Sequence, residues 1–171
     1  EILIGLVGSE MCIRDSKNVP AIAMAHGIPY VATATVADLH DLERKVRYAM
    51  TFHGARYIHI LVPCPLGWGA ASSKTIELAR LAHETGLFPV FEAEYGEVTK
   101  VSKIRRKQPV EKYMMLQKRF AHLFGKKGNP EIVQRMQALA DRNIARYGLL
   151  GDEQGDDIPV PEQAEERHHV I

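Results

Sequence analysis

Cysteine is scarce in this chain, which limits the chemistry that the sequence can support by itself. The 171 residues include two cysteines, Cys12 and Cys64. Two cysteines do not form the disulfide framework of a small secreted protein, so we expect a reducing, cytoplasmic location. An iron–sulfur cluster usually takes four thiolates, so neither cysteine is expected to hold a cluster without ligands from elsewhere.

Long apolar runs and an excess of one charge are missing as well. No run approaches the ~18 apolar residues needed to span a bilayer, so no membrane segment is expected. The net charge of +1 gives no general attraction to nucleic acid or to an acidic membrane surface. The residue order of a secretory signal is also absent. The hydrophobic content of 46% is that of a soluble globular protein.

A glycine-rich phosphate-binding motif is not present either. Gly67 and Gly69 flank Trp68, but the rest of G-x-G-x-x-G is missing and the loop does not follow the first predicted strand. Glu92 and Glu94 alternate along a predicted strand and therefore share one face of the sheet. We interpret both carboxylates as structural, because nothing in the sequence places them in a pocket.

What the sequence does contain, from Lys17 onward, is an alternation of helical and strand patterns. The predicted helices cover residues 19–27, 36–52 and 75–86. The predicted strands cover residues 28–34, 56–63 and 87–94. The connections between them are short, so the predicted class is α/β with a largely parallel sheet.

The C-terminal third has a different character. A helical stretch is predicted for about 110–124, and a last amphipathic helix is predicted to begin after Asn129, its N-cap, and to end near Tyr147. Residues 151–171 are acidic, contain two prolines and lack periodicity. We expect this segment to be a disordered tail.

The segment IHILVPCPLGWG, residues 58–69, contains the candidate site. Ligands of open α/β sheets bind beyond the carboxyl ends of parallel strands, and Cys64 lies at such a position. Pro63 and Pro65 fix φ and offer no N–H, so the backbone around the sulfur is stiff. A cysteine held in this way suits a metal or iron–sulfur ligand. The alternative is a small buried hydrophobic residue.

Several long blocks of the chain resemble the C-terminal half of the β subunit of 2-oxoacid:ferredoxin oxidoreductases, a family that includes pyruvate synthase. They are KNVPAIAMAHGIPYVATATVADLHDLERKV, RYIHILVPCPLGWG and TIELARLAHETGLFPVFEAEYG, in that order. PVEKYMMLQKRFAHL resembles the C-terminal helical extension of that subunit. The resemblance implies a partial thiamine-diphosphate-binding fold, mostly parallel and flanked by helices, at 17–108 and the helical extension at 109–150.

The family resemblance also implies cofactors and partners. In this family the β subunit binds thiamine diphosphate with Mg²⁺ and a [4Fe–4S] cluster, and works with an α subunit and in some members γ and δ subunits. The substrates are a 2-oxoacid and coenzyme A, and ferredoxin takes the electrons. Cys64 matches the fourth cluster cysteine of the family, in its late P-C-P loop.

The motifs for the other cluster ligands and for the diphosphate are not found in this chain. They are a paired cysteine motif, a Gly-Asp-Gly segment and a pair of asparagines. We therefore expect no catalytic or cofactor-binding residue here other than Cys64, and no activity from the chain by itself. Pyruvate leads among the substrates, with branched-chain 2-oxoacids and 2-oxoglutarate open. The alternative function is a non-catalytic α/β binding or assembly module that has lost the cofactor half.

Two further groups of residues have alternative interpretations. A basic run could meet acidic ferredoxin or the phosphates of coenzyme A, or could be a solvated, subunit-facing surface. Its members are Lys100, Lys103, Arg105, Arg106 and Lys107. His26 and His59 lie among apolar residues and are expected to be satisfied core or interface histidines. His168 and His169, in the acidic tail, are expected to be incidental.

The opening segment matches nothing in the family. LVGSEMCIRDS, Leu6–Ser16, lacks the glycine spacing and the lysine of a phosphate loop. It resembles the translation of a transposon-end adapter used to prepare sequencing libraries. Residues 1–16 are therefore expected to be non-native, and Cys12 is excluded from the chemistry. On this expectation the N-terminal half of the subunit is missing, and the sheet exposes an unpaired edge or an apolar face.

Overall fold

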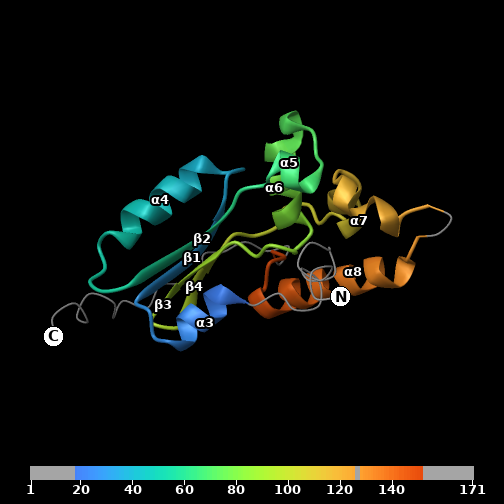
Figure 1. Ribbon diagram of the computed structural model, residues 1–171. Coiled ribbons are helices and arrows are strands. Elements are labelled where there is room, and N and C mark those ends of the chain that lie inside the picture. The colour runs from blue at the N-terminus through green and yellow to red at the C-terminus, as the bar shows by residue number, and fades with distance from the viewer. Residues whose placement is uncertain (1–17, 126–127, 152–171) are drawn as a thin grey trace, which may run out of the picture.

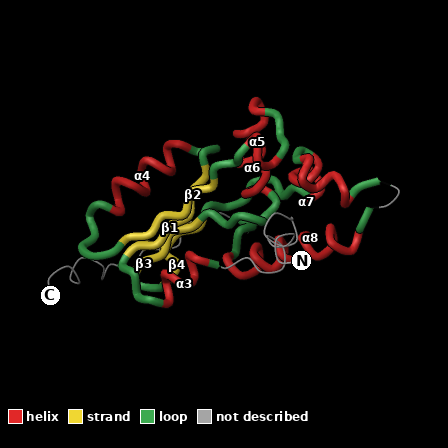
Figure 2. The backbone as a smooth tube through the Cα atoms, viewed as in Figure 1, coloured by secondary structure: helices red, strands yellow, loops and turns green. Residues whose placement is uncertain are grey.

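The computed structural model describes residues 18–125 and 128–151. Within these ranges one four-stranded sheet, in the order β2-β1-β3-β4, forms the centre, and helices lie on both of its faces (Figures 1 and 2). The predicted α/β class, a sheet flanked by helices and followed by a helical extension, is confirmed. The predicted segment 1–16 and all of the predicted tail 151–171 except Gly151 lie outside the described residues.

The sheet is mixed, which corrects the prediction of a largely parallel sheet. β1 (Tyr30–Thr35) is parallel to β2 (Arg56–Leu61) and antiparallel to β3 (Phe91–Glu94). β4 (Glu97–Val101) is antiparallel to β3. Tyr95 and Gly96 join β3 to β4, and both have positive φ, at 49° and 92°. Positive φ at both positions of a two-residue loop makes a tight hairpin, which the sequence analysis missed.

Helices cover β1 from both sides, so all six of its residues are buried. On one face, α4 (Leu39–Ala49) packs Ala49 against Tyr30 and Ala32. On the other face, α3 (Val19–Ala25) packs Ala23 against Val31. The two helices begin where side chains cap them, since Asn18 Oδ1 accepts from the Ala21 N–H at 3.0 Å and Asp38 Oδ1 from the Asp41 N–H at 2.9 Å.

The helical extension is made of separate pieces. α7 (Val110–Met115) is followed by the 3₁₀ segment η2 (Lys118–Leu123), so the helix predicted for 110–124 is interrupted. Gln117 lies at the break in an extended conformation, and its buried side chain donates from Nε2 to the Tyr113 carbonyl at 2.6 Å. This side-chain bond replaces the continuing helical ladder.

α8 (Pro130–Tyr147) agrees with its prediction at both ends. Asn129 caps it and Gly148, with a φ of 58°, ends it. α6 (Thr75–Glu84), preceded by the short 3₁₀ turn η1 (Ser72–Lys74), contributes Leu78 to a core that it shares with α7, η2 and α8. This core joins the extension to the sheet domain. No helix in the described part of the chain is long and apolar enough to cross a membrane.

β2 lies at one edge of the sheet and differs from β1 in burial. Among the described residues it is hydrogen-bonded to β1 alone, and each of its six residues is exposed or half-buried. Ile60 and, just past the strand, Val62 are exposed. The expected exposed apolar edge is present in the described structure.

Candidate functional site

Cys64 lies beyond the carboxyl end of β2, the parallel edge strand, as the sequence predicts. Its side chain is exposed, so the alternative of a small buried hydrophobic residue is wrong. Cys64 is the N-cap of a short helix, α5 (Pro65–Trp68), which the sequence analysis did not foresee. Its Sγ accepts a hydrogen bond from the Gly67 N–H at 3.4 Å.

The loop that follows Cys64 is closed by backbone hydrogen bonds. The Trp68 N–H donates to the Cys64 carbonyl at 3.0 Å, and the Ala70 N–H donates to the Pro65 carbonyl at 2.9 Å. Gly69 ends α5 with a φ of 63°, a left-handed conformation that glycine adopts without strain. Pro65 begins the helix, where its missing N–H costs nothing. The sulfur is therefore attached to a stiff frame.

The loop offers one thiolate ligand and no complete metal site. In residues 18–125 and 128–151, no group of three or more His, Cys, Asp or Glu side chains converges. An exposed thiol with an N–H donor beside it is suited to iron–sulfur ligation, because hydrogen bonds to the sulfurs help to set the cluster potential. The residues present fit one corner of a cluster, and the other ligands would have to come from elsewhere.

A buried ionic network connects α4 to β3, and sequence reasoning missed most of its members. The Glu92 carboxylate is 2% exposed and accepts from Arg44 at 2.6 and 3.2 Å and from the Tyr30 hydroxyl at 2.7 Å. Lys45, also 2% exposed, donates from Nζ to the Thr33 carbonyl at 2.9 Å and to Asp41 at 2.5 Å. The apolar pattern of the helix gave no signal for this network, because Lys45 and Ala49 face the sheet whereas Leu39, Val46 and Met50 are exposed.

Electrostatics in this network favour the charged carboxylate. Burial alone raises the pKa of Glu92, but the hydrogen bonds from Arg44 and Tyr30 outweigh it and hold that pKa below its usual value. Burial, followed by the hydrogen bond to Glu92, raises the pKa of the Tyr30 hydroxyl. Glu92 is therefore a fully paired structural anion, which agrees with the interpretation from sequence. Glu94 accepts from the Tyr48 hydroxyl at 3.0 Å.

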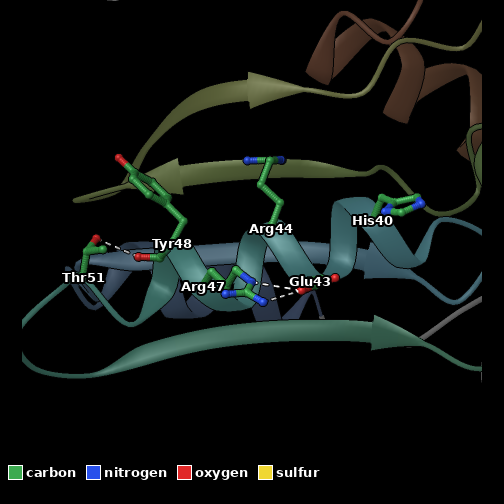
Figure 3. A pocket seen from close by; sticks show the side chains of 6 residues that line it. All are labelled: His40, Glu43, Arg44, Arg47, Tyr48 and Thr51. Atoms are coloured by element: carbon green, nitrogen blue, oxygen red, sulfur yellow. Dashed lines mark hydrogen bonds and ion pairs between the residues drawn. The ribbon is translucent and has the colours of Figure 1, made fainter.

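A shallow pocket of about 500 Å³ lies along α4 (Figure 3). Its lining residues are His40, Glu43, Arg44, Arg47, Tyr48 and Thr51. Arg47 and Glu43 form an ion pair at 2.7 Å, while Arg44 and Tyr48 are engaged by the carboxylates of β3. The Cys64 loop contributes nothing to this pocket. Arg44 attaches α4 to β3, whereas the Glu43–Arg47 pair lies within α4 itself.

The two histidines predicted to be core or interface residues lie in different surroundings, and the interface alternative stays a prediction. His26 is exposed, so it is not a core residue. His59 is half-buried between the rings of Tyr57 and Phe88, at centroid distances of 6.2 and 5.5 Å. Its Nδ1 is buried and has no hydrogen-bond partner in the described part of the chain. The hydrogen bond expected for this histidine is therefore not found there. His168 and His169 lie outside the described residues.

The basic run divides into two groups. Lys103 donates to the Gly148 carbonyl at 2.8 Å and Lys107 pairs with Asp141 at 2.7 Å, so both connect the segment after β4 to the C-terminal helix and its cap. Lys100, Arg105 and Arg106 are exposed, as Lys103 and Lys107 are. The exposed run agrees with a solvated surface, and contact with a partner subunit or an acidic protein stays a prediction.

Comparison with known proteins identifies relatives for most of the chain, although no family model matches it. Pyruvate synthase subunit PorB of Methanosarcina barkeri is 49% identical over 136 residues, which cover 80% of this chain and 46% of the relative. The PorB subunit of Methanocaldococcus jannaschii is 42% identical, with 80% and 44% covered. Ketoisovalerate oxidoreductase subunit VorB of Pyrococcus abyssi is 40% identical over 124 residues, with 71% and 39% covered. The chain spans less than half the length of these relatives.

Proposed function

The chain belongs to the family of 2-oxoacid:ferredoxin oxidoreductase β subunits that includes PorB and VorB, and we propose that it forms the C-terminal part of such a subunit. The resemblance found in the sequence is confirmed by these relatives. The proposal assigns residues 17–108 to part of a thiamine-diphosphate-binding domain and 109–150 to a helical extension. Residues 1–16 are assigned to an adapter-derived segment and 151–171 to an acidic tail.

The central element of the proposal is Cys64 as one ligand of a [4Fe–4S] cluster. Its exposed thiol, the Gly67 N–H beside the sulfur and the stiff proline-flanked loop support this role. A cluster held there would supply a one-electron acceptor for the oxidation of the substrate. The remaining thiolates and the groups that bind thiamine diphosphate and Mg²⁺ belong to the part of the subunit that this chain does not span.

The complete enzyme is proposed to decarboxylate a 2-oxoacid oxidatively, to form acyl-coenzyme A and to pass electrons to ferredoxin in the cytoplasm. The names of the relatives point to pyruvate and to ketoisovalerate as candidate substrates. Proposed partners are the α subunit and, in some assemblies, γ and δ subunits. Arg105 and Arg106 are exposed and lie on a surface suited to an acidic partner.

The edge of the sheet supports a role as part of a larger domain. β2 presents an apolar sequence, with Ile60 and Val62 exposed. Leu39 and Val46 of α4 are exposed as well. Monomeric proteins usually protect such an edge with charges, proline or a covering segment. A strand and a covering layer from the rest of the subunit would bury these residues.

A chimera tests the proposal. The N-terminal part of Methanosarcina barkeri PorB joined to residues 17–171 is expected to take up one [4Fe–4S] cluster per subunit under anaerobic reconstitution, about four iron atoms. The Cys64→Ser version is expected to lose a large part of the iron and to change the electron paramagnetic resonance signal of the reduced cluster.

Two controls accompany the chimera. Val98→Ser, in β4, is expected to leave the iron content unchanged. The 171-residue chain alone is expected to bind neither the cluster nor thiamine diphosphate. Equal iron content and spectra in the chimera with Cys64 and in its Cys64→Ser version would contradict the ligand role. A chimera that folds without any cofactor would favour the alternative, a non-catalytic α/β module.

A further inference from the structure

Arg119, in the helical extension, lies against the ring of Trp68 in the Cys64 loop. Its guanidinium carbon is 4.1 Å from the centroid of the Trp68 ring and 4.6 Å from that of Phe120. A guanidinium at this distance from an indole makes a cation–π contact, for which tryptophan is the best partner. Trp68 is the last residue of α5, the helix that Cys64 caps. In Figure 1, α5 and α7, the first helix of the extension, lie beyond the same end of the sheet.

The guanidinium is itself held in place. Arg119 Nε donates to Gln117 Oε1 at 2.8 Å, and Gln117 Nε2 donates to the Tyr113 carbonyl at 2.6 Å. Gln117 is 1% exposed, and Phe120 belongs to the core shared by α6, α7, η2 and α8. Arg119 is thus connected through Gln117 to α7, so its side chain offers a fixed surface to the indole.

A second contact joins the same two segments at the next residue of the loop. The Lys118 N–H donates to the Gly69 carbonyl at 3.3 Å. A Cβ on Gly69 would lie 2.7 Å from Lys118 Cβ, so the backbones approach too closely for any other residue without movement. Contacts at positions 68 and 69 therefore fix the end of α5 opposite to Cys64.

We propose that Arg119 is a positioning residue for Cys64, acting through Trp68. The Trp68 N–H is bonded to the Cys64 carbonyl and the Gly67 N–H to Sγ, so one short turn connects the indole to the sulfur. Holding Trp68 in place holds that turn, and with it the direction of the Cys64 side chain. Lysine would supply the charge without the planar surface that stacks on an indole. The significance for metal binding rests on the proposed function, whereas the positioning itself does not.

Amide hydrogen exchange in the full chain tests the inference without any metal. Cys12→Ser in all samples leaves Cys64 as the one thiol. Arg119→Ala is expected to speed exchange of the Trp68 and Ala70 amides about two- to fivefold, the effect of losing a partly exposed cation–π contact. The Ala32 amide, in β1, is expected to keep its rate. Arg142→Ala, which removes an exposed arginine of α8, is the matched control.

The result that would overturn the inference is equal exchange of the loop amides in the Arg119→Ala and Arg142→Ala proteins, or an equal acceleration at Ala32. If Arg119→Ala fails to fold, the same exchange measurement is made on Arg119→Lys, which keeps the charge and a similar side-chain length. It must still accelerate the loop amides, and wild-type rates would refute the role of the planar guanidinium. The two proposals can fail separately. If Cys64→Ser leaves the iron content and spectra of the chimera unchanged while Arg119→Ala still speeds exchange in the loop, the ligand role is refuted and the positioning role stands.

Discussion

At the scale of single residues, Glu92 shows how the sheet accommodates a buried charge. Its carboxylate accepts hydrogen bonds from Arg44 and Tyr30, and Lys45 lies in the same network through Asp41. A buried ion pair contributes little net stability compared with apolar packing, but removal of one partner is costly because the other charge is left unpaired. We therefore expect this network to determine how α4 lies on β1 and β3.

Acid should weaken this network in a defined direction. The native pKa of Glu92 is below its usual value of 4.5, so the unfolded state binds more protons and stability rises with pH. The contribution is fully present above pH 4.5 and is lost as the pH falls through the native pKa. Glu92→Gln should therefore flatten the pH dependence of the urea midpoint below pH 4.5.

The control for this experiment is Asp141→Asn. The hydrogen bond from Lys107 lowers the pKa of Asp141, but this side chain is about half exposed. Solvent screens such a pair, so its removal should change the acid profile less than Glu92→Gln does. An acid profile of Glu92→Gln that parallels the wild type would contradict the stabilising role of the charged Glu92.

At the scale of secondary-structure elements, local signals account for what could be predicted. Caps and periodicity located α3, α4, α6 and α8, and the apolar runs located β1 and β2. The β3–β4 hairpin was missed because its turn, Tyr95-Gly96, lacks the usual Asn-Gly or Asp-Gly signature. The break at Gln117 depends on a buried side-chain bond, and the contact of Arg119 with Trp68 joins residues far apart in sequence. Neither the break nor this contact produces a periodic pattern in the sequence.

The hairpin turn makes a quantitative prediction. Gly96 has a φ of 92°, and a Cβ there would lie 3.3 Å from the Met24 carbonyl oxygen, in α3. Gly96→Ala should lower the free energy of unfolding by about 1–3 kcal/mol, measured by urea denaturation, because alanine is strained at this φ. At Gly151, a Cβ would meet no described atom within 4 Å, so Gly151→Ala should change stability by less than about 0.5 kcal/mol. Equal effects would contradict the strain argument.

At the scale of the whole molecule, the two edges of the sheet differ in chemistry. β4 carries Glu97 and Lys100 and is short, as protected edge strands are. β2 has a mainly apolar sequence and is parallel to β1. An unprotected apolar edge can pair with another chain, so the chain by itself should be marginally stable or aggregate. A sharp two-state melt of the monomer would count against this expectation.

One substitution at each edge of the sheet tests which edge strand promotes aggregation. Ile60, in β2, and Val98, in β4, are both 40% exposed. Ile60→Lys should slow aggregation of the chain, followed by light scattering at 37 °C, because a charge blocks edge pairing. Val98→Lys should change the aggregation rate much less. Similar rates for both variants would mean that β2 is not the edge through which the chain aggregates.

Trp68 is the one tryptophan among the 171 residues, and it lies in the Cys64 loop under Arg119. Intrinsic fluorescence excited at the indole band will therefore follow this loop and the 3₁₀ segment beside it. A thermal or denaturant curve recorded by emission measures release of the loop, whereas circular dichroism measures loss of the helices. If the loop opens before the domain unfolds, the two curves will not coincide, and the optical signal will follow the environment of the proposed cluster ligand.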